Sequence, residues 1–211
     1  TNMIRSYIHR CQEDGVKIVM NCEVTPELIK EEKPDSVIIA TGSKTLILPI
    51  EGIDNPAIIH GSDLLDGKRA AGKKVLVVGG GMVGCETAAF LGEQEHDVTV
   101  IEFRDTVGAD VIHEHRVYLM KDFEDYGIKE ITGAKVCKFY EDGVEYETAD
   151  GVRHESRGYD SVILSMGFRN YNPLEEKIKD LVPETHVIGD AIRARRALDA
   201  TKEAYEVASR I

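Results

Sequence analysis

The sequence predicts an α/β fold in which a buried parallel sheet is covered by helices. A continuous apolar run, KVLVV at 74–78, has the pattern of a strand that is buried on both faces. A glycine-rich turn follows it and opens a helix over 82–93. A second observation is that a helix–strand pattern with a similar closing strand occurs twice along the chain. Alternation of this kind is typical of parallel α/β sheets.

The glycine turn carries the strongest functional signal. It reads G-x-G-x-x-G and lies between a strand and a helix, the context that supports dinucleotide binding. The first glycine allows a tight turn, the second lets the backbone approach a pyrophosphate, and the third lets helix and strand pack closely. The free N–H groups at the helix N-terminus form an anion site. We therefore expect the NAD pyrophosphate to lie against the backbone of Gly79, Gly80, Gly81, Met82, Val83 and Gly84.

An acidic residue ends the next strand. Residues 98–101 form this strand, and Glu102 lies about 20 residues past the glycines, where such folds place a carboxylate for the ribose hydroxyls. A carboxylate there repels a 2′-phosphate, which favours NADH over NADPH. Arg104 is either a phosphate-binding cation or a solvated loop residue. The alternative for the whole motif is a glycine turn that binds nothing.

Composition limits the remaining functions. The 211 residues carry 26 Lys and Arg against 38 Asp and Glu, a net charge of −12, which argues against nucleic acid or an anionic membrane as a partner. No apolar run approaches the ~18 residues of a spanning helix. The four cysteines form no C-x-x-C pair, so we expect no metal site and a reduced, cytoplasmic setting. Cys85, at the helix N-terminus, is expected to be a small packed residue rather than a reactive thiol.

Two copies of one pattern are present. KPDSVIIATG at 33–42 matches GYDSVILSMG at 158–167, and each is preceded by an amphipathic helix and a similar segment, DGVKIVMNC or YGIKEITGA. The second copy is complete and contains a three-stranded antiparallel meander with Asp-Gly turns over 136–155. The first copy has no glycine turn of its own. We therefore expect the chain to be a piece of a longer protein that lacks the front of its first dinucleotide domain.

The order of these copies predicts two domains. Residues 1–66 and 167–211 are expected to form one split domain, which ends with a short strand at 187–189 and a helix at 197–211. Residues 72–166 are expected to form a second, inserted domain. No side chain in either domain is predicted to act as a catalytic acid or base.

Two further motifs carry a family resemblance. The ATG at 40–42 and the VIGDA at 187–191 bracket the inserted domain. In this the chain resembles the flavoprotein reductases of the pyridine nucleotide-disulfide oxidoreductase superfamily, such as glutathione reductase and thioredoxin reductase, in which an NAD(P)H domain interrupts an FAD domain. In the sequence of these motifs it most resembles the C-terminal part of multidomain NADH:flavin oxidoreductases. These are the 2-enoate reductase and 2,4-dienoyl-CoA reductase group, which is related to trimethylamine dehydrogenase.

The resemblance implies roles for individual residues. Asp190 would bind the FAD ribityl chain, with Thr41 and Gly42 in the same crevice; the alternative is that Gly189 and Asp190 only cap a helix. Two other positions have alternatives of similar weight. Glu86 lies near the nicotinamide or is an ordinary first-turn glutamate, and Gly167 is a cofactor-facing turn or a plain strand end.

The implied function is that of an oxidoreductase module. It would position NADH for hydride transfer to FAD in a reductase of activated C=C bonds, whose FMN barrel and iron–sulfur cluster lie in a missing N-terminal part. One alternative is a structural module that holds ADP or another nucleotide, as in trimethylamine dehydrogenase-like enzymes. A standalone NADH:acceptor reductase is disfavoured because the first glycine turn is missing. For the same reason we expect this piece to bind FAD weakly or not at all and to be inactive alone.

Overall fold

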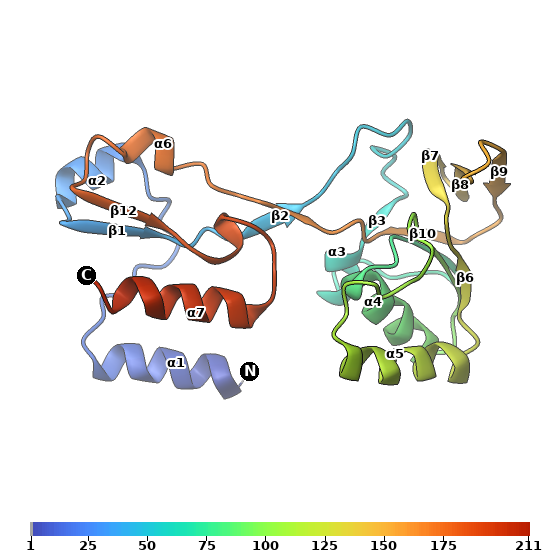
Figure 1. Ribbon diagram of the computed structural model, residues 1–211, viewed down its shortest axis with the longest axis horizontal. Coiled ribbons are helices and arrows are strands. Elements are labelled where there is room, and N and C mark those ends of the chain that lie inside the picture. The colour runs from blue at the N-terminus through green and yellow to red at the C-terminus, as the bar shows by residue number, and fades with distance from the viewer. Residues whose placement is uncertain (1) are drawn as a thin grey trace. The chain divides into compact units, whose positions relative to one another are not determined.

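The computed structural model describes residues 2–211 and divides the chain into two compact units (Figure 1). Residues 43–169 form one, here called the central unit. Residues 2–42 and 170–211 form the other, here called the split unit. The α/β class expected from the sequence is confirmed: the central unit combines a parallel sheet with an antiparallel meander. The assignment of the two units to NAD and FAD binding stays a prediction.

A five-stranded parallel sheet forms the middle of the central unit. Its strand order is β3-β10-β4-β5-β6. The chain runs from β4 through α4 to β5 on one side, whereas β10 and β3 lie on the other side of β4. The crevice at the carboxyl ends of β4 and β10 is therefore the switch point at which open α/β sheets bind ligands. The strands are β3 (Ile59–His60), β4 (Lys74–Val78), β5 (Asp97–Ile101), β6 (Lys129–Ile131) and β10 (Ser161–Leu164).

The continuous apolar character of β4 is explained by burial on both faces. Val75 and Val77 pack in the core with the helices α3 (Gly61–Leu65), α4 (Met82–Glu93) and α5 (His113–Asp125). Leu76 and Val78 pack on the opposite face with Phe139 of the meander. Each of these four β4 side chains is at most 2% exposed, and such burial contributes about 1.5–3 kcal/mol per side chain.

The meander completes a three-layer arrangement, with the helices on one face of the parallel sheet and the meander on the other (Figure 1). Its strands are antiparallel, as the Asp-Gly turns predict. They are β7 (Lys135–Tyr140), β8 (Gly143–Glu147) and β9 (Arg153–Ser156). A further two-stranded sheet joins β2 (Ser43–Thr45) and β11 (Phe168–Asn170), at the boundaries of the units.

The split unit is built on two parallel strands. β1 (Ser36–Ile39) pairs with β12 (Glu184–Val187), and Ile39 packs with α2 (Pro26–Glu32) and α6 (Glu175–Ile178) in a small core. The strand that the sequence places at 187–189 lies at 184–187, because pairing with β1 ends there and η1 (Gly189–Ala191) begins. The final helix, α7, spans Ala197–Ala208.

Much of the apolar surface of the split unit is exposed. The first helix, α1 (Asn2–Glu13), has no buried residue, although its apolar residues share one face. Residues 16–20 read like the strand β6 of the second copy but form no strand, because no neighbouring strand pairs with them. The exposed side chains, each at least 46% exposed, include Ile4, Ile8, Val16, Ile18, Val19 and Met20.

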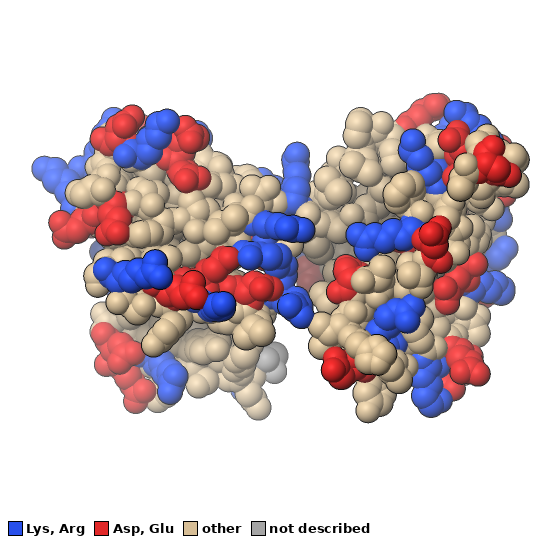
Figure 2. Space-filling model, viewed as in Figure 1, with Lys and Arg blue, Asp and Glu red and all other residues tan. Residues whose placement is uncertain are grey.

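The charged surface is mixed. On the face shown in Figure 2, acidic side chains are interspersed with Lys and Arg on each unit. Within residues 2–211, none of the helices combines the length and apolar character needed to cross a membrane.

Candidate dinucleotide-binding site

The glycine turn is closely packed at every glycine of the motif. Gly79 has a φ of +103°, and a Cβ atom there would overlap the carbonyl oxygen of Ser165. A Cβ atom at Gly84 would overlap the carbonyl oxygen of Gly79, because helix α4 approaches the end of β4 very closely. These are the tight turn and the close helix–strand packing that a dinucleotide fold requires of its first and third glycines.

The middle of the turn lies against the end of β5. A Cβ atom at Gly80 would lie 2.9 Å from the Cβ of Glu102 and 2.9 Å from the Cγ1 of Val107. At Gly81 the nearest atom would be Oδ2 of Asp110, at 3.2 Å. The turn is therefore held between β10 on one side and the loop that follows β5 on the other.

Glu102 is fixed by two backbone donors. Its Oε2 accepts from the N–H of Gly80 at 2.6 Å, and its Oε1 accepts from the N–H of Arg104 at 2.9 Å. A carboxylate has about four acceptor positions, so both oxygens can still accept from a pair of ribose hydroxyls. The structure thus joins the two parts of the motif that the sequence singled out, the glycine turn and the acid.

The loop from Glu102 to Val111, here called the bracing loop, covers the glycine turn. Gly108 donates its N–H to the carbonyl oxygen of Gly80 at 2.7 Å. Asp110 accepts from the N–H of Met82 at 3.0 Å. Arg116 of α5 holds the loop from the other side, donating to the carbonyl oxygen of Val107 at 3.1 Å and to Oγ1 of Thr106 at 2.9 Å.

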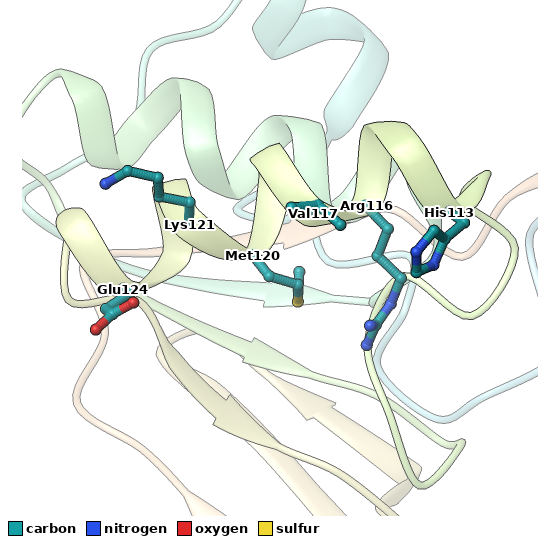
Figure 3. Close-up of a pocket in the computed structure, with 6 residues that line it drawn as sticks. All are labelled: His113, Arg116, Val117, Met120, Lys121 and Glu124. Carbon is teal, nitrogen blue, oxygen red and sulfur yellow. The ribbon is translucent and has the colours of Figure 1, made fainter.

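Asp110 and Arg116 were not singled out by the sequence. Asp110 lies just before a helix, where an acidic residue usually caps that helix, and nothing in its spacing indicates a contact with α4. Arg116 extends away from α5 and lines a shallow groove along one face of that helix (Figure 3). The other lining residues are His113, Val117, Met120, Lys121 and Glu124.

Cys85 is a packed thiol, as expected. It is fully buried, and its Sγ donates to the carbonyl oxygen of Gly80 at 3.3 Å. Burial raises the pKa of the Cys85 thiol to about 12. Since the thiolate is the nucleophile, the residue is unreactive near neutral pH.

A labelling experiment checks this assignment. At pH 8 the Cys85 thiol should stay unmodified by iodoacetamide while the exposed Cys22 is alkylated, because Cys85 is buried and its raised pKa leaves almost no thiolate at that pH. Peptide mass spectrometry gives both rates, and unfolding in denaturant should expose Cys85 to the reagent. Alkylation of Cys85 at the rate of Cys22 in the folded protein would contradict the prediction.

Two of the predicted contact residues are exposed beside this turn. Glu86 lies 3.5 Å from Nε2 of His115 on α5, and the two form an ion pair when the imidazole is protonated. Arg104 accepts from the N–H of Gly133 through its carbonyl oxygen, and its side chain is exposed. The roles of Glu86 near a nicotinamide and of Arg104 beside a phosphate stay predictions.

The carboxyl end of β10 forms the other wall of the switch point. Ser165 lies beyond β10, is 8% exposed, and its Oγ has no hydrogen-bond partner. Gly167 has a φ of +94° with open space at its Cβ position, and its carbonyl oxygen accepts from the N–H of Leu46 at 2.9 Å. A turn with a left-handed glycine therefore follows the second closing strand, as the repeat predicts.

The two predicted FAD-contacting stretches meet at one edge of the split unit. Because β1 and β12 are parallel, Thr41 and Gly42 follow β1 at the edge where Gly189 and Asp190 follow β12. Thr41 donates to the carbonyl oxygen of Tyr171. Gly42 and Gly189 have φ values of +75° and +60°.

Asp190 binds the backbone just before α7. Its Oδ1 accepts from the N–H of Arg195 at 3.1 Å, and at the start of α7 the N–H of Arg196 donates to Oδ2 of Asp199 at 3.2 Å. Gly189 donates its N–H to Oε2 of Glu203 at 2.7 Å. The pKa of Glu203 is lowered, chiefly by its hydrogen bond from the guanidinium of Arg195. No group of three or more His, Cys, Asp or Glu residues suited to a metal ion is found in residues 2–211.

This geometry is that of an α/β dinucleotide-binding fold. A family model described as pyridine nucleotide-disulphide oxidoreductase matches residues 5–186, and the chain belongs to that family. The match confirms the resemblance on which the sequence analysis relied.

Similar proteins are larger reductases and oxidases. The chain is 30% identical over 212 residues to cinnamate reductase of Clostridium sporogenes and 32% identical over 202 residues to NADH oxidase of Thermoanaerobacter brockii. These alignments cover 99% and 93% of this chain but only 31% of each relative. A solved complex of 2-naphthoyl-CoA reductase has 31% identity and a TM-score of 0.89, with 99% of this chain and 32% of that chain covered. The chain thus spans about a third of the length of these relatives.

Proposed function

We propose that this chain is the nucleotide-binding module of a multidomain flavin oxidoreductase that reduces activated C=C bonds. The central unit binds NADH, and the split unit contributes part of an FAD site. The observation that supports the proposal is the tightly packed glycine turn, with the Glu102 carboxylate beside it and bound to the N–H groups of Gly80 and Arg104. The similarity to cinnamate reductase and 2-naphthoyl-CoA reductase supports the reaction class.

The residues present fit a dinucleotide in the central unit. Backbone N–H groups of Met82 and Val83 lie at the N-terminus of α4, where a pyrophosphate is stabilised by the helix dipole. The glycines themselves place no side chain between this backbone and a ligand. The chain's task is to bind and orient the nucleotide; the hydride chemistry belongs to the nicotinamide and the flavin when they are bound.

The split unit fits only part of a flavin site. Thr41, Gly42, Gly189 and Asp190 meet at one sheet edge, but the described residues of the unit contain one pair of strands, β1 and β12, and no G-x-G-x-x-G turn. Its exposed apolar residues on α1 and over 16–20 are the surface that a further part of the same domain would cover. We infer that FAD binding requires that part, and that the FMN barrel and iron–sulfur cluster belong to the remaining two thirds of the protein.

Stopped-flow absorbance of the full-length protein tests the proposal. Mixing with NADH should bleach the flavin absorbance near 450 nm, because bound NADH reduces the FAD. A full-length protein that binds NADH without bleaching would instead support the alternative, a structural module that holds a nucleotide. A Gly79→Val variant serves as a control. Its side chain would overlap the carbonyl oxygen of Ser165 and disrupt the glycine turn, so NADH should no longer bleach the flavin.

A further inference from the structure

An acidic side chain lies on the anion-binding end of α4. Oδ1 of Asp110 accepts from the N–H of Met82, the first residue of α4, at 3.0 Å. Its Oδ2 lies 3.2 Å from the position that a Cβ of Gly81 would take, so both oxygens are close to the start of the helix. The partial positive charge at a helix N-terminus stabilises one such anion.

The bracing loop sets the position of this carboxylate. Gly108 is bound to Gly80 at 2.7 Å, and Val111 donates its N–H to the carbonyl oxygen of Gly108 at 3.1 Å. Arg116 anchors the same loop through Val107. Asp110 is therefore carried by backbone that is tied to the glycine turn at one end and to α5 at the other, although its side chain is exposed.

Few donors remain for a pyrophosphate at this end of α4. Cys85 already donates its N–H to the carbonyl oxygen of Gly81, and Gly84 is buried against Gly79. The remaining backbone N–H groups at this end, all in partly exposed residues, are those of Gly81, Met82 and Val83. Asp110 uses that of Met82.

We propose that Asp110 is an affinity-determining residue that competes with the diphosphate of the nucleotide for the N-terminus of α4. This inference rests on the proposed function, since it needs a diphosphate ligand at the glycine turn. A bound pyrophosphate brings two further negative charges to a carboxylate that already holds Met82. The side chain of Asp110 must therefore turn away when the ligand binds, and its charge weakens binding.

The test compares nucleotide affinities of the full-length protein and an Asp110→Asn variant. Asparagine keeps an acceptor for Met82 and nearly the same shape but removes the charge. By isothermal titration at low salt, we expect NADH and ADP-ribose to bind Asp110→Asn roughly tenfold more tightly, since removing one like charge a few ångströms away is worth about that factor. Adenosine, which has no phosphate, should bind both proteins equally.

Three controls separate this effect from others. Asp105→Asn removes a charge from the same loop and should leave NADH affinity within about twofold of the unmodified protein, as expected for an exposed charge. At 0.5 M salt the gain in Asp110→Asn should shrink, because salt screens exposed charges. An Asp110→Ser variant with the melting temperature of the parent provides a second uncharged side chain if asparagine disturbs folding.

The outcomes are distinguishable. Unchanged or weaker NADH binding by folded Asp110→Asn and Asp110→Ser, or an equal gain for adenosine, would overturn the role of Asp110 and leave the proposed function intact. If neither the parent nor the variants bound NADH or ADP-ribose, the proposed function and this inference would both fail.

Discussion

Replacing Glu102 with alanine should weaken NADH binding by about 10- to 100-fold while changing NADPH binding much less. The Glu102 carboxylate is held by Gly80 and Arg104 with acceptor positions left for two ribose hydroxyls. Hydrogen bonds to a charged group contribute about 1.5–3 kcal/mol, which corresponds to that loss in affinity. NADPH carries a 2′-phosphate that the carboxylate repels. Removing the carboxylate therefore also removes this repulsion, which offsets the lost hydrogen bonds for NADPH, and the selectivity for NADH should fall.

Titration of both nucleotides into the full-length protein measures this change. Because Glu102 also accepts from Gly80, the variant could loosen the glycine turn, and a thermal melt is needed beside each titration. Asp105→Ala is a matched control, since it removes a carboxylate from the same loop without disturbing the bond to Gly80. An unchanged ratio of NADH to NADPH affinity in folded Glu102→Ala would remove this residue from the proposed site.

Replacing Gly84 with alanine should strongly destabilise the central unit. An added Cβ would overlap the carbonyl oxygen of Gly79, and neither backbone segment can shift without moving α4 from β4. Overpacking typically costs about 1–3 kcal/mol, and overlap with a backbone oxygen places this substitution at the upper end of that range, about 3 kcal/mol. A loss of that size should lower the melting temperature by about 6–12 °C for a domain of this size.

The comparison for this variant is Gly158→Ala. Gly158 has a φ of +79° but open space at its Cβ position, so alanine there meets only the backbone cost of about 1 kcal/mol. Circular dichroism melts of the two variants distinguish steric overlap from loss of glycine's conformational freedom. Equal melting temperatures would show that α4 and β4 do not pack as closely as the structure has them.

The sequence predicted the strands, glycine turn and meander over 74–156 well because their signals are local. The apolar run of β4, the G-x-G-x-x-G turn and the Asp-Gly turns each act over a few residues, and each leads to the expected element. The carboxylate of Glu102 was also predictable, since the βαβ connection fixes which strand ends lie beside the turn.

Other parts depended on contacts between distant segments. Residues 16–20 have the composition of a strand, but a strand also needs a partner, and none pairs with them here. The bond from Met82 to Asp110 links positions 28 residues apart and follows no periodic pattern. The end of β12 was misplaced because pairing with β1, rather than the apolar character of Val187 and Ile188, decides it.

The guanidinium of Arg116 connects the bracing loop beside the glycine turn to helix α5. It reaches from α5 to the bracing loop, and that loop in turn holds Gly80 through Gly108. A ligand that displaces Asp110 should therefore shift the bracing loop that Arg116 holds. The rate of amide hydrogen exchange along α5 should then change when a nucleotide binds at the glycine turn. The helix would report binding through how often it unfolds locally, while its average structure stays the same.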